Sequence, residues 1–270
     1  MKARTWQLVP ELLRDATARA IIPRFAALRA EDVRLKAANE PVSVADRDAE
    51  ALISHRLRQL LPGSLVIGEE ACASDPSLLP KLAQGTVWLV DPVDGTGNFI
   101  AGRPPFAVMV ALLRDGETVG SWILDPLTGR TAVAERGGGA WIDGRPVRAS
   151  GDSDQPNDLC GIVSEAFIPA DKAPLIARLR QAVGKVVPTV RCAGHEYPQV
   201  AVGERDFALY WRTLAWDHAP GALFLTEAGG RVLHLDGSPY RPTAPRPGLL
   251  LARTPAVAAQ LLEVVGRAAA

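Results

Sequence analysis

A pair of aspartates at a strand end is the feature of this sequence with the clearest potential for chemistry. Asp91 and Asp94 stand in the segment Asp91-Pro92-Val93-Asp94-Gly95-Thr96-Gly97-Asn98-Phe99. The apolar run 87–90 before it is short and branched, which predicts a buried strand that ends at the aspartates. Asp91 and Asp94 lie three positions apart across the turn that follows, so both carboxylates can point into one pocket. Oxygen ligands without Cys or His favour Mg²⁺ or Mn²⁺ over Zn²⁺. The alternative interpretation is an Asp-rich surface turn.

A second pair of carboxylates follows another predicted strand. The run 65–67 is a short buried strand that ends in Gly68-Glu69-Glu70. This arrangement repeats that of the Asp91 segment, although a Glu pair is more often solvated surface. Residues 71–84 are small, polar and Pro-containing, which predicts a mobile loop between the two strands.

Two more aspartates stand near predicted helix starts. Asp46 lies just before a helix that runs to about Leu61, and either Ser43 or Asp46 is predicted to cap it. Asp217 begins a helix over 215–227, where capping is again the simplest explanation. His218 beside it has no spaced partner, so we expect a packed or surface His rather than a metal ligand.

The remaining pattern predicts helices and sheets in layers. An amphipathic helix is predicted over 6–29 with a kink at Pro23, followed by an antiparallel meander of strands at 106–113, 119–124, 131–135 and 140–142. A Ser-, Asp- and Pro-rich boundary at 149–157 precedes predicted strands at 159–163, 186–190, 207–211, 232–233 and 249–251 and helices at 172–183, 195–202, 215–227 and 255–268. We therefore predict an α/β layered sandwich (α+β in its first part) of two halves, 1–150 with the antiparallel sheet and most metal ligands and 151–270 closing the active site, in one compact catalytic unit.

Composition narrows the class of protein. The chain has 270 residues, 47% of them apolar, and a formal net charge of zero, which disfavours disorder and a broad nucleic-acid-binding surface. Cys72, Cys160 and Cys192 are odd in number and widely spaced, as expected of free thiols in a reducing compartment. The sequence shows no signal peptide and no long apolar run, so we predict a cytoplasmic protein without a membrane partner.

The order of three motifs resembles the inositol monophosphatase family of Mg²⁺-dependent phosphatases. These motifs are a strand-terminal G-E-E, then D-P-x-D-G-T-x-N-F, then W-D opening a helix that closes in E-A-G-G. The wider superfamily includes histidinol-phosphate phosphatase and fructose-1,6-bisphosphatase, and the N-terminal segments 22–25 and 40–47 also look like the histidinol-phosphate branch. The resemblance covers nearly the whole chain and implies a layered sandwich of helices and sheets.

The resemblance also implies roles for individual residues. Glu69, Asp91 and the Val93 carbonyl would bind one metal ion, and Asp91, Asp94 and Asp217 a second, with a third ion sharing Glu69; the implied cofactor is two or three Mg²⁺, with Mn²⁺ as an alternative. Asp46 and Thr96 would orient and deprotonate the attacking water, with Glu69 as the third catalytic residue. The implied substrate-binding residues are Asp94, Gly95, Thr96, Gly194, His195, Arg212 and Asp217.

One departure from the family pattern concerns specificity. Inositol-selective members have a Glu seven residues before the W-D aspartate, where this chain has Tyr210, with Arg212 close by. An Arg in the pocket favours a substrate with a second anionic group, although Arg212 can equally be solvent-facing or an ion-pair partner.

The predicted function is therefore a Mg²⁺-dependent phosphomonoesterase for a small polyol or sugar phosphate. Cations would shield the phosphoryl group and activate the attacking water. The alternatives are a phosphatase for histidinol phosphate, fructose 1,6-bisphosphate or a 3′-phosphonucleotide, and a catalytically silent binding or regulatory protein. The expected partner is a small phosphate ester, without nucleic acid, and the resemblance implies a homodimer.

Overall fold

The computed structural model describes residues 3–36, 40–151 and 153–266, without the side chains of 3–5. Residues 37–39 of the predicted polar turn, residue 152 of the predicted boundary and residues 267–268 of the predicted last helix lie outside these ranges. The α-helices are α1 (Ala3–Ala16), α2 (Val44–Leu60), α3 (Glu69–Ser74), α4 (Thr96–Ile100), α5 (Ala173–Ala182), α6 (Ala193–Ala201), α7 (Ala215–Glu227) and α8 (Pro255–Gly266). Short 3₁₀ segments include Ala30–Asp32, Pro156–Asp158 and Ala170–Lys172.

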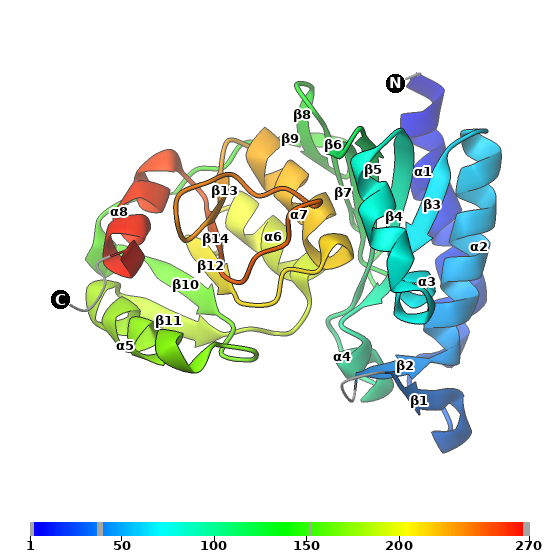
Figure 1. The fold of residues 1–270 in the computed structure, drawn as a ribbon, viewed down its shortest axis with the longest axis horizontal. Coiled ribbons are helices and arrows are strands. Elements are labelled where there is room, and N and C mark those ends of the chain that lie inside the picture. The colour runs from blue at the N-terminus through cyan, green and yellow to red at the C-terminus, as the bar shows by residue number, and fades with distance from the viewer. Residues whose placement is uncertain (1–2, 37–39, 152, 267–270) are drawn as a thin grey trace.

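Helices and sheets alternate in layers (Figure 1). In the described chain the strands form a seven-stranded sheet, a five-stranded sheet and a two-stranded hairpin. Apolar side chains of α1 and α2 pack on one face of the seven-stranded sheet, and those of α6 and α7 fill the space between the two large sheets. Helices α5 and α8 cover the outer face of the five-stranded sheet. The predicted layered sandwich is confirmed.

The seven-stranded sheet is the predicted meander with one parallel strand added at its edge. Its strands, in spatial and chain order, are β3 (Leu65–Gly68), β4 (Thr86–Asp94), β5 (Ala107–Arg114), β6 (Glu117–Leu124), β7 (Thr131–Glu135), β8 (Gly139–Ile142) and β9 (Arg145–Val147). Strand β3 runs parallel to β4, and every later pair is antiparallel. Strand β9 was not predicted because it is short and contains Pro146.

The five-stranded sheet is mixed. Its strands lie in the order β11 (Lys185–Pro188), β10 (Cys160–Val163), β12 (Phe207–Tyr210), β14 (Leu249–Ala252) and β13 (Arg231–His234). Strand β10 is parallel to both of its neighbours, whereas β14 is antiparallel to both of its own. The strands and helices predicted for this part of the chain are therefore present, with ends shifted by a few residues.

A small hairpin leads the chain into α2. Strands β1 (Val33–Leu35) and β2 (Pro41–Ser43) pair antiparallel, and β1 was not predicted. Ser43 then caps α2, because its hydroxyl accepts a hydrogen bond from the Ala45 N–H and its own N–H donates to the Asp46 carboxylate. Both residues proposed as the cap thus take part in one capping box.

The long first helix predicted over 6–29 is wrong in its second half. Helix α1 ends at Ala16. The chain then continues as a π-helical turn, Thr17–Ile21, and a 3₁₀ turn, Ile22–Arg24. Pro23 has no N–H to continue an α-helical ladder, and Phe25 turns to an extended conformation with ψ of 127°. The apolar spacing correctly indicated that this region packs against the core, but it did not indicate where the α-helix ends.

The mobile loop predicted between the first two acidic segments is also wrong. Residues 69–74 form α3, and Pro76–Ala83 form a 3₁₀ helix. Leu82 is buried, and the Asp75 side chain caps the second turn by accepting from the Ser77 N–H. The buried leucine and the capping aspartate together stabilise helical structure in a segment whose composition is typical of a loop.

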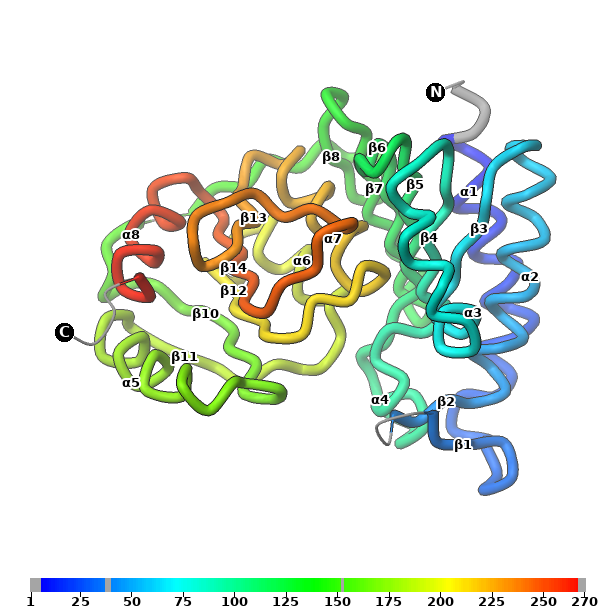
Figure 2. The backbone as a smooth tube through the Cα atoms, in the orientation of Figure 1, coloured from blue at the N-terminus to red at the C-terminus, as the bar shows by residue number. Residues whose placement is uncertain are grey.

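Figure 2 follows the chain from the seven-stranded sheet to the five-stranded sheet, with α1 and α8 at opposite sides of the molecule. The first of these sheets ends at Val147 and the second begins at Cys160. The division at residues 150 and 151 into two halves stays a prediction. Among the described helices, none is both long and apolar enough to span a membrane.

Candidate active site

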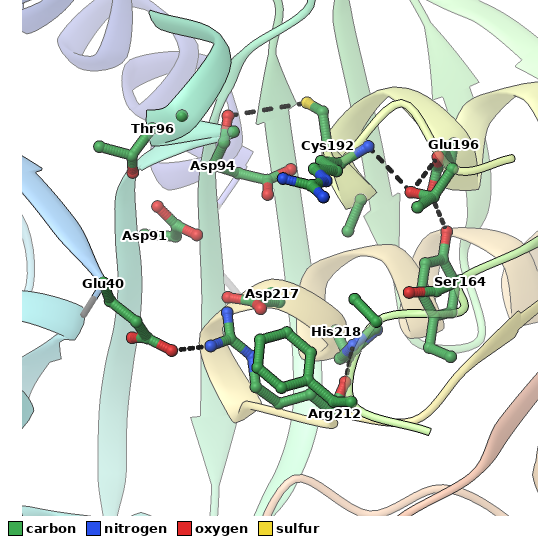
Figure 3. Close-up of a pocket in the computed structure, with 18 of the residues that line it drawn as sticks. Glu40, Asp91, Asp94, Thr96, Ser164, Cys192, Glu196, Arg212, Asp217 and His218 are labelled. Carbon is green, nitrogen blue, oxygen red and sulfur yellow. Dashed lines mark hydrogen bonds and ion pairs between the residues drawn. The ribbon is translucent and has the colours of Figure 1, made fainter. Parts of the chain in front are cut away.

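Four carboxylates from three elements meet at a cavity of about 410 Å³. Asp91 and Asp94 come from β4, Glu69 is the first residue of α3, and Asp217 lies in the first turn of α7. Figure 3 shows the side chains of Asp91, Asp94 and Asp217 around one space. The sequence-predicted residues in the cavity lining are Glu69, Asp91, Val93, Asp94, Gly95, Thr96, Arg212 and Asp217.

A bulge in β4 explains how two aspartates three positions apart serve one cavity. Neighbouring residues of a regular strand point to opposite faces, so positions 91 and 94 would diverge. Here Asp91 pairs with Met109 and Asp94 with Ala107, so three steps along β4 oppose two along β5. The extra residue turns the later part of the strand and brings both carboxylates to the same side. The strand therefore continues to Asp94, rather than ending at Val90 as its apolar run predicts.

Gly194 holds Asp94 in place. Its N–H donates to Asp94 Oδ2 at 2.6 Å. A Cβ on residue 194 would lie 2.6 Å from Ala107 Cβ, so the close approach of α6 to β5 requires glycine. The structure thus places the backbone of Gly194 on a predicted metal ligand.

The environment of these acids opposes their ionisation. Burial, together with the neighbouring negative charges, raises the pKa of Asp94 and of Asp217 to about 7 and that of Glu69 to about 8. The pKa of Asp91 is raised well above its usual value for the same reasons. Four acids gathered with so little solvent need a positive charge to be ionised at neutral pH.

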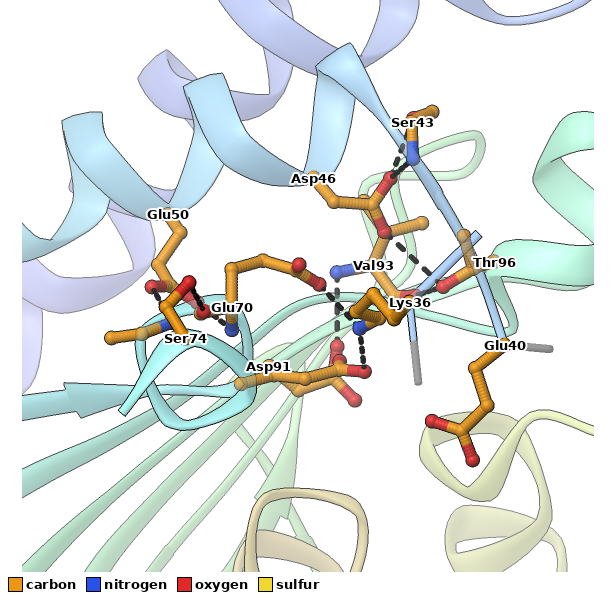
Figure 4. Close-up of polar contacts among 12 residues, drawn as sticks. Lys36, Glu40, Ser43, Asp46, Glu50, Glu70, Ser74, Asp91, Val93 and Thr96 are labelled. Atoms are coloured by element: carbon orange, nitrogen blue, oxygen red, sulfur yellow. Dashed lines mark hydrogen bonds and ion pairs between the residues drawn. The ribbon is translucent and has the colours of Figure 1, made fainter. Parts of the chain in front are cut away.

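Lys36 supplies one positive charge. Its Nζ donates to Glu69 Oε1 and to Glu70 Oε1, at 2.7 Å each. Burial alone would lower the pKa of Lys36, but the two carboxylates outweigh it and raise that pKa. Figure 4 shows Lys36 with its contact to Glu70, and Glu50 accepting hydrogen bonds from the N–H groups at the start of α3. No sequence motif marked Lys36, because a lysine before a polar turn is normally solvated.

The donor set fits a hard divalent cation. Among the described residues, no three His, Cys, Asp or Glu side chains already form a closed cage. Mg²⁺ does not need one, because it keeps several waters and binds through a few carboxylate oxygens. Glu69, Asp91, Asp94 and Asp217, with the Val93 carbonyl, are the oxygens that could hold it.

Thr96 and Asp46 form a hydrogen-bonded pair beside the carboxylates. Thr96 Oγ1 lies 3.2 Å from Asp46 Oδ1 and 2.9 Å from the Val93 carbonyl, and its single hydrogen can be donated to one of them at a time. Asp46 lies behind Thr96, fully buried, and Ser43 donates to its other oxygen. Burial raises the pKa of Asp46 to about 6, although the Ser43 hydrogen bonds oppose the shift.

Gly95 allows the tight connection between β4 and α4. Its φ is +87°, and a Cβ there would lie 3.0 Å from the Pro105 carbonyl oxygen and 3.2 Å from that of Arg191. Only glycine suits both the conformation and the space. Gly95 and Thr96 thereby lie in the wall of the cavity next to the carboxylates.

The two remaining predicted substrate-binding residues have other partners. His195 Nε2 lies 3.4 Å from Asp125 Oδ2 and lines a separate cavity of about 70 Å³, so the structure does not bring it to the carboxylates. Arg212 does line the main cavity, where its guanidinium is ion-paired with Glu40 (Figure 3). The ion-pair interpretation of Arg212 is therefore confirmed.

Sequence reasoning missed a buried polar wall opposite the metal ligands. The Glu196 carboxylate accepts from the Tyr210 hydroxyl, the Thr189 hydroxyl and the Val190 N–H. His218 is packed, as predicted, with Nδ1 3.0 Å from the Tyr197 hydroxyl and Nε2 3.0 Å from the Arg212 carbonyl. Burial lowers the pKa of His218 to about 4, so it is neutral and holds the segment that carries Arg212.

Known proteins share this architecture. The family model described as "Inositol monophosphatase family" matches residues 11–269. The inositol-1-monophosphatase of Rhizobium meliloti (strain 1021) is 34% identical over 204 residues, 73% of each chain, and the Nus factor SuhB of Pseudomonas aeruginosa is 34% identical over 215 residues, 76% of each. The solved structure of the extragenic suppressor protein SuhB from Bartonella henselae has a TM-score of 0.81 at 25% identity, covering 97% of this chain and all of that one.

Proposed function

Because the chain belongs to the inositol monophosphatase family and is a phosphoric monoester hydrolase, we propose that it hydrolyses a small polyol or sugar phosphate with the help of two or three Mg²⁺ ions. Mn²⁺ is the alternative cofactor. The observation that carries this proposal is the Thr96–Asp46 hydrogen bond beside four converging carboxylates. A carboxylate cluster alone binds cations, whereas the added hydroxyl–carboxylate pair suits proton transfer from water.

The metal ions, when bound, shield the phosphoryl charge and make a coordinated water more acidic. Glu69, Asp91 and the Val93 carbonyl are the proposed ligands of one ion, and Asp91, Asp94 and Asp217 those of another. A cation held by Glu69 would share that carboxylate with Lys36, whose Nζ donates to Oε1 at 2.7 Å.

The chain's own residues then orient the water and take its proton. The Thr96 oxygen accepts a hydrogen bond from the attacking water while its own hydrogen is donated to Asp46. As the water oxygen bonds to phosphorus, the bond from phosphorus to the ester oxygen breaks, the water proton passes to Thr96 and the Thr96 proton passes to Asp46 Oδ1. The ester oxygen takes a proton from solvent and leaves as the alcohol. A pKa of Asp46 near 6 leaves that carboxylate mostly ionised at neutral pH and still able to accept a proton.

The phosphate lies, in this proposal, between the carboxylates and the start of α4. Gly95 and Thr96 line that part of the cavity, and their N–H groups are the proposed hydrogen-bond donors to its oxygens. Asp94 and Asp217 face the ester oxygen. A cavity of about 410 Å³ suits a small ester rather than a macromolecule.

A regulatory protein without turnover is the second candidate, because one relative is named a Nus factor. Such a protein would need neither the Thr96 hydroxyl nor the buried Asp46 beside the metal ligands. Their hydrogen bond therefore favours catalysis.

Phosphate release from a panel of esters tests the proposal. The panel contains inositol 1-phosphate, glycerol 2-phosphate, histidinol phosphate, fructose 1,6-bisphosphate and adenosine 3′,5′-bisphosphate, each with Mg²⁺. We expect inositol 1-phosphate or glycerol 2-phosphate to be hydrolysed. Turnover of histidinol phosphate, the sugar bisphosphate or the nucleotide alone would move the assignment to that alternative, and no turnover of any ester would favour the regulatory candidate.

A further inference from the structure

Aromatic side chains dominate one wall of the cavity. Phe167, Tyr210 and Trp211 all line it, and they come from the segment after β10 and from the end of β12. Phe167 is 65% exposed, one of the most exposed large apolar side chains of the described chain. The guanidinium carbon of Arg212 lies 4.6 Å from the centre of its ring, so one face of the ring carries a stacked cation.

The backbone at Phe167 is strained. Its φ is +62°, a conformation that bulky side chains rarely adopt. Such outliers persist where the surroundings hold them and gather at binding sites. Nearby, the Ser164 N–H is fixed on the Leu209 carbonyl at 2.9 Å, which ties the start of this segment to β12. An exposed aromatic ring in a strained position on a cavity wall indicates ligand contact rather than packing.

Three polar side chains of the cavity lining are already engaged with other residues. The hydroxyls of Tyr210 and Thr189 already donate hydrogen bonds to Glu196, whose side chain is fully buried. The Arg212 guanidinium is ion-paired with Glu40. Recognition of a polyhydroxylated ring needs free polar groups aimed at it, and these groups are already engaged.

We propose that the stacked pair of Phe167 and Arg212 is a platform for a planar ring on the leaving group. The preferred substrates would then be phosphate monoesters of a polyol or sugar that also carries an aromatic or heteroaromatic ring. The inference rests on the proposed phosphatase function and narrows its substrate class. The Glu40 ion pair holds the Arg212 guanidinium, whose carbon lies over the Phe167 ring, and a planar ring of the substrate would stack on an outer face of this pair.

Two matched esters test the platform directly. Benzyl phosphate and cyclohexylmethyl phosphate have the same charge and the same CH₂–O–P bond, and they differ mainly in the planarity of the ring. We expect kcat/KM to be about five- to tenfold higher for benzyl phosphate, the factor that aromatic stacking typically gives. In Phe167→Leu this ratio should fall to within about twofold of one, whereas Phe167→Tyr, which keeps the ring, should retain it.

Leu127→Ala provides the control for a surface apolar change, because Leu127 is exposed and lies outside the cavity lining. It should leave the ratio at the wild-type value. Equal kcat/KM values for the two esters in the wild type, or an undiminished ratio in Phe167→Leu, would overturn the platform while leaving the phosphatase assignment intact. Fructose 1,6-bisphosphate, which has no aromatic ring, hydrolysed well ahead of benzyl phosphate would assign Arg212 to an anionic group and overturn the platform as well. No phosphate release from any ester would overturn the proposed function and this inference together.

Discussion

The hydroxyl of Thr96 lies 3.2 Å from the carboxylate of Asp46, joining two residues fifty positions apart. Thr96 begins α4 after the Gly95 turn, and Asp46 is fixed in the first turn of α2 by its hydrogen bonds to Ser43. Two rigid elements thus bring a proton donor and a buried acceptor together at the edge of the carboxylate cluster. The proposed activation of water depends on this contact.

Removing the Thr96 hydroxyl should lower the rate without unfolding the protein. Valine has nearly the same shape as threonine but cannot pass a proton, so we expect Thr96→Val to lower kcat by about 10²–10³-fold. Thr96→Ser keeps the hydroxyl and should stay within about tenfold of the wild type. Steady-state phosphate release measures both variants, with thermal unfolding as the check on folding. Equal rates in Thr96→Val and the wild type would exclude the proton-transfer role.

Two glycines near the site should respond oppositely to the same substitution. Gly194→Ala places a Cβ 2.6 Å from Ala107 Cβ, and we expect it to lower the free energy of unfolding by about 1–3 kcal/mol and to weaken metal binding through Asp94. Gly97 has open space around it and lies inside α4, so Gly97→Ala should be neutral or stabilising by up to about 1 kcal/mol. Chemical denaturation of both variants gives the comparison. A Gly194→Ala protein as stable as Gly97→Ala would contradict the close approach of α6 and β5.

The acidic motifs and the order of elements were predictable because each leaves a local pattern. Apolar runs just before Gly68-Glu69 and Asp91 marked two neighbouring strands, and the short strand patterns between residues 106 and 142 marked the meander. The family resemblance is confirmed by the match over residues 11–269. The sequence was therefore sufficient to predict the candidate site residues and, approximately, the helices and strands that hold them.

Details that depend on tertiary contacts were not predictable. The β4 bulge is visible only as a register shift against β5, and the salt bridges of Lys36 join segments more than thirty residues apart. His195 turns to Asp125 because α6 presents it to the β6–β7 turn rather than to the carboxylates. The assignments of individual ligands and catalytic residues stay predictions, which the variants proposed here test.

Lys36 should contribute most to the stability of the folded protein when no metal ion is present. Lys36→Met keeps the length of the side chain but leaves Glu69 and Glu70 without their cation, so we expect the metal-free protein to lose about 2–3 kcal/mol of stability. Mg²⁺ should restore most of this loss by neutralising Glu69. Lys172→Met, which removes an exposed lysine paired with Asp171, should cost less than about 1 kcal/mol and show no Mg²⁺ dependence. A Lys36→Met loss that Mg²⁺ leaves unchanged would show that Lys36 and the ion do not share a site.

The stability of the metal-free protein should fall as the pH rises. The pKa of Asp94 and of Asp217 is about 7 in the folded chain against 3.8 ordinarily, so folding favours the protonated acids. Their stabilisation is complete below pH 4 and is lost as the pH rises through 7, by a total of the order of a few kcal/mol. Thermal unfolding in EDTA should give a lower Tm at pH 8 than at pH 5, and Mg²⁺ should reverse the difference.

Asp217→Asn is the matched variant for this pH dependence, because it removes one of the two acids while keeping its size. Its Tm in EDTA should fall less between pH 5 and pH 8 than that of the wild type. A wild-type Tm that rises over this range, or identical slopes in the two proteins, would contradict the raised pKa values.

The most direct test of the central claim is the rate of phosphate release from inositol 1-phosphate during a Mg²⁺ titration, for the wild type and Asp94→Asn. Asp94 lies in the carboxylate cluster and is held by the Gly194 N–H, so the asparagine keeps its shape while losing the charge. The account predicts no release in EDTA, saturable activation of the wild type by Mg²⁺, and a rate about a thousandfold lower in a folded Asp94→Asn protein. Release that continues undiminished in EDTA, or an Asp94→Asn variant as active as the wild type, would contradict it.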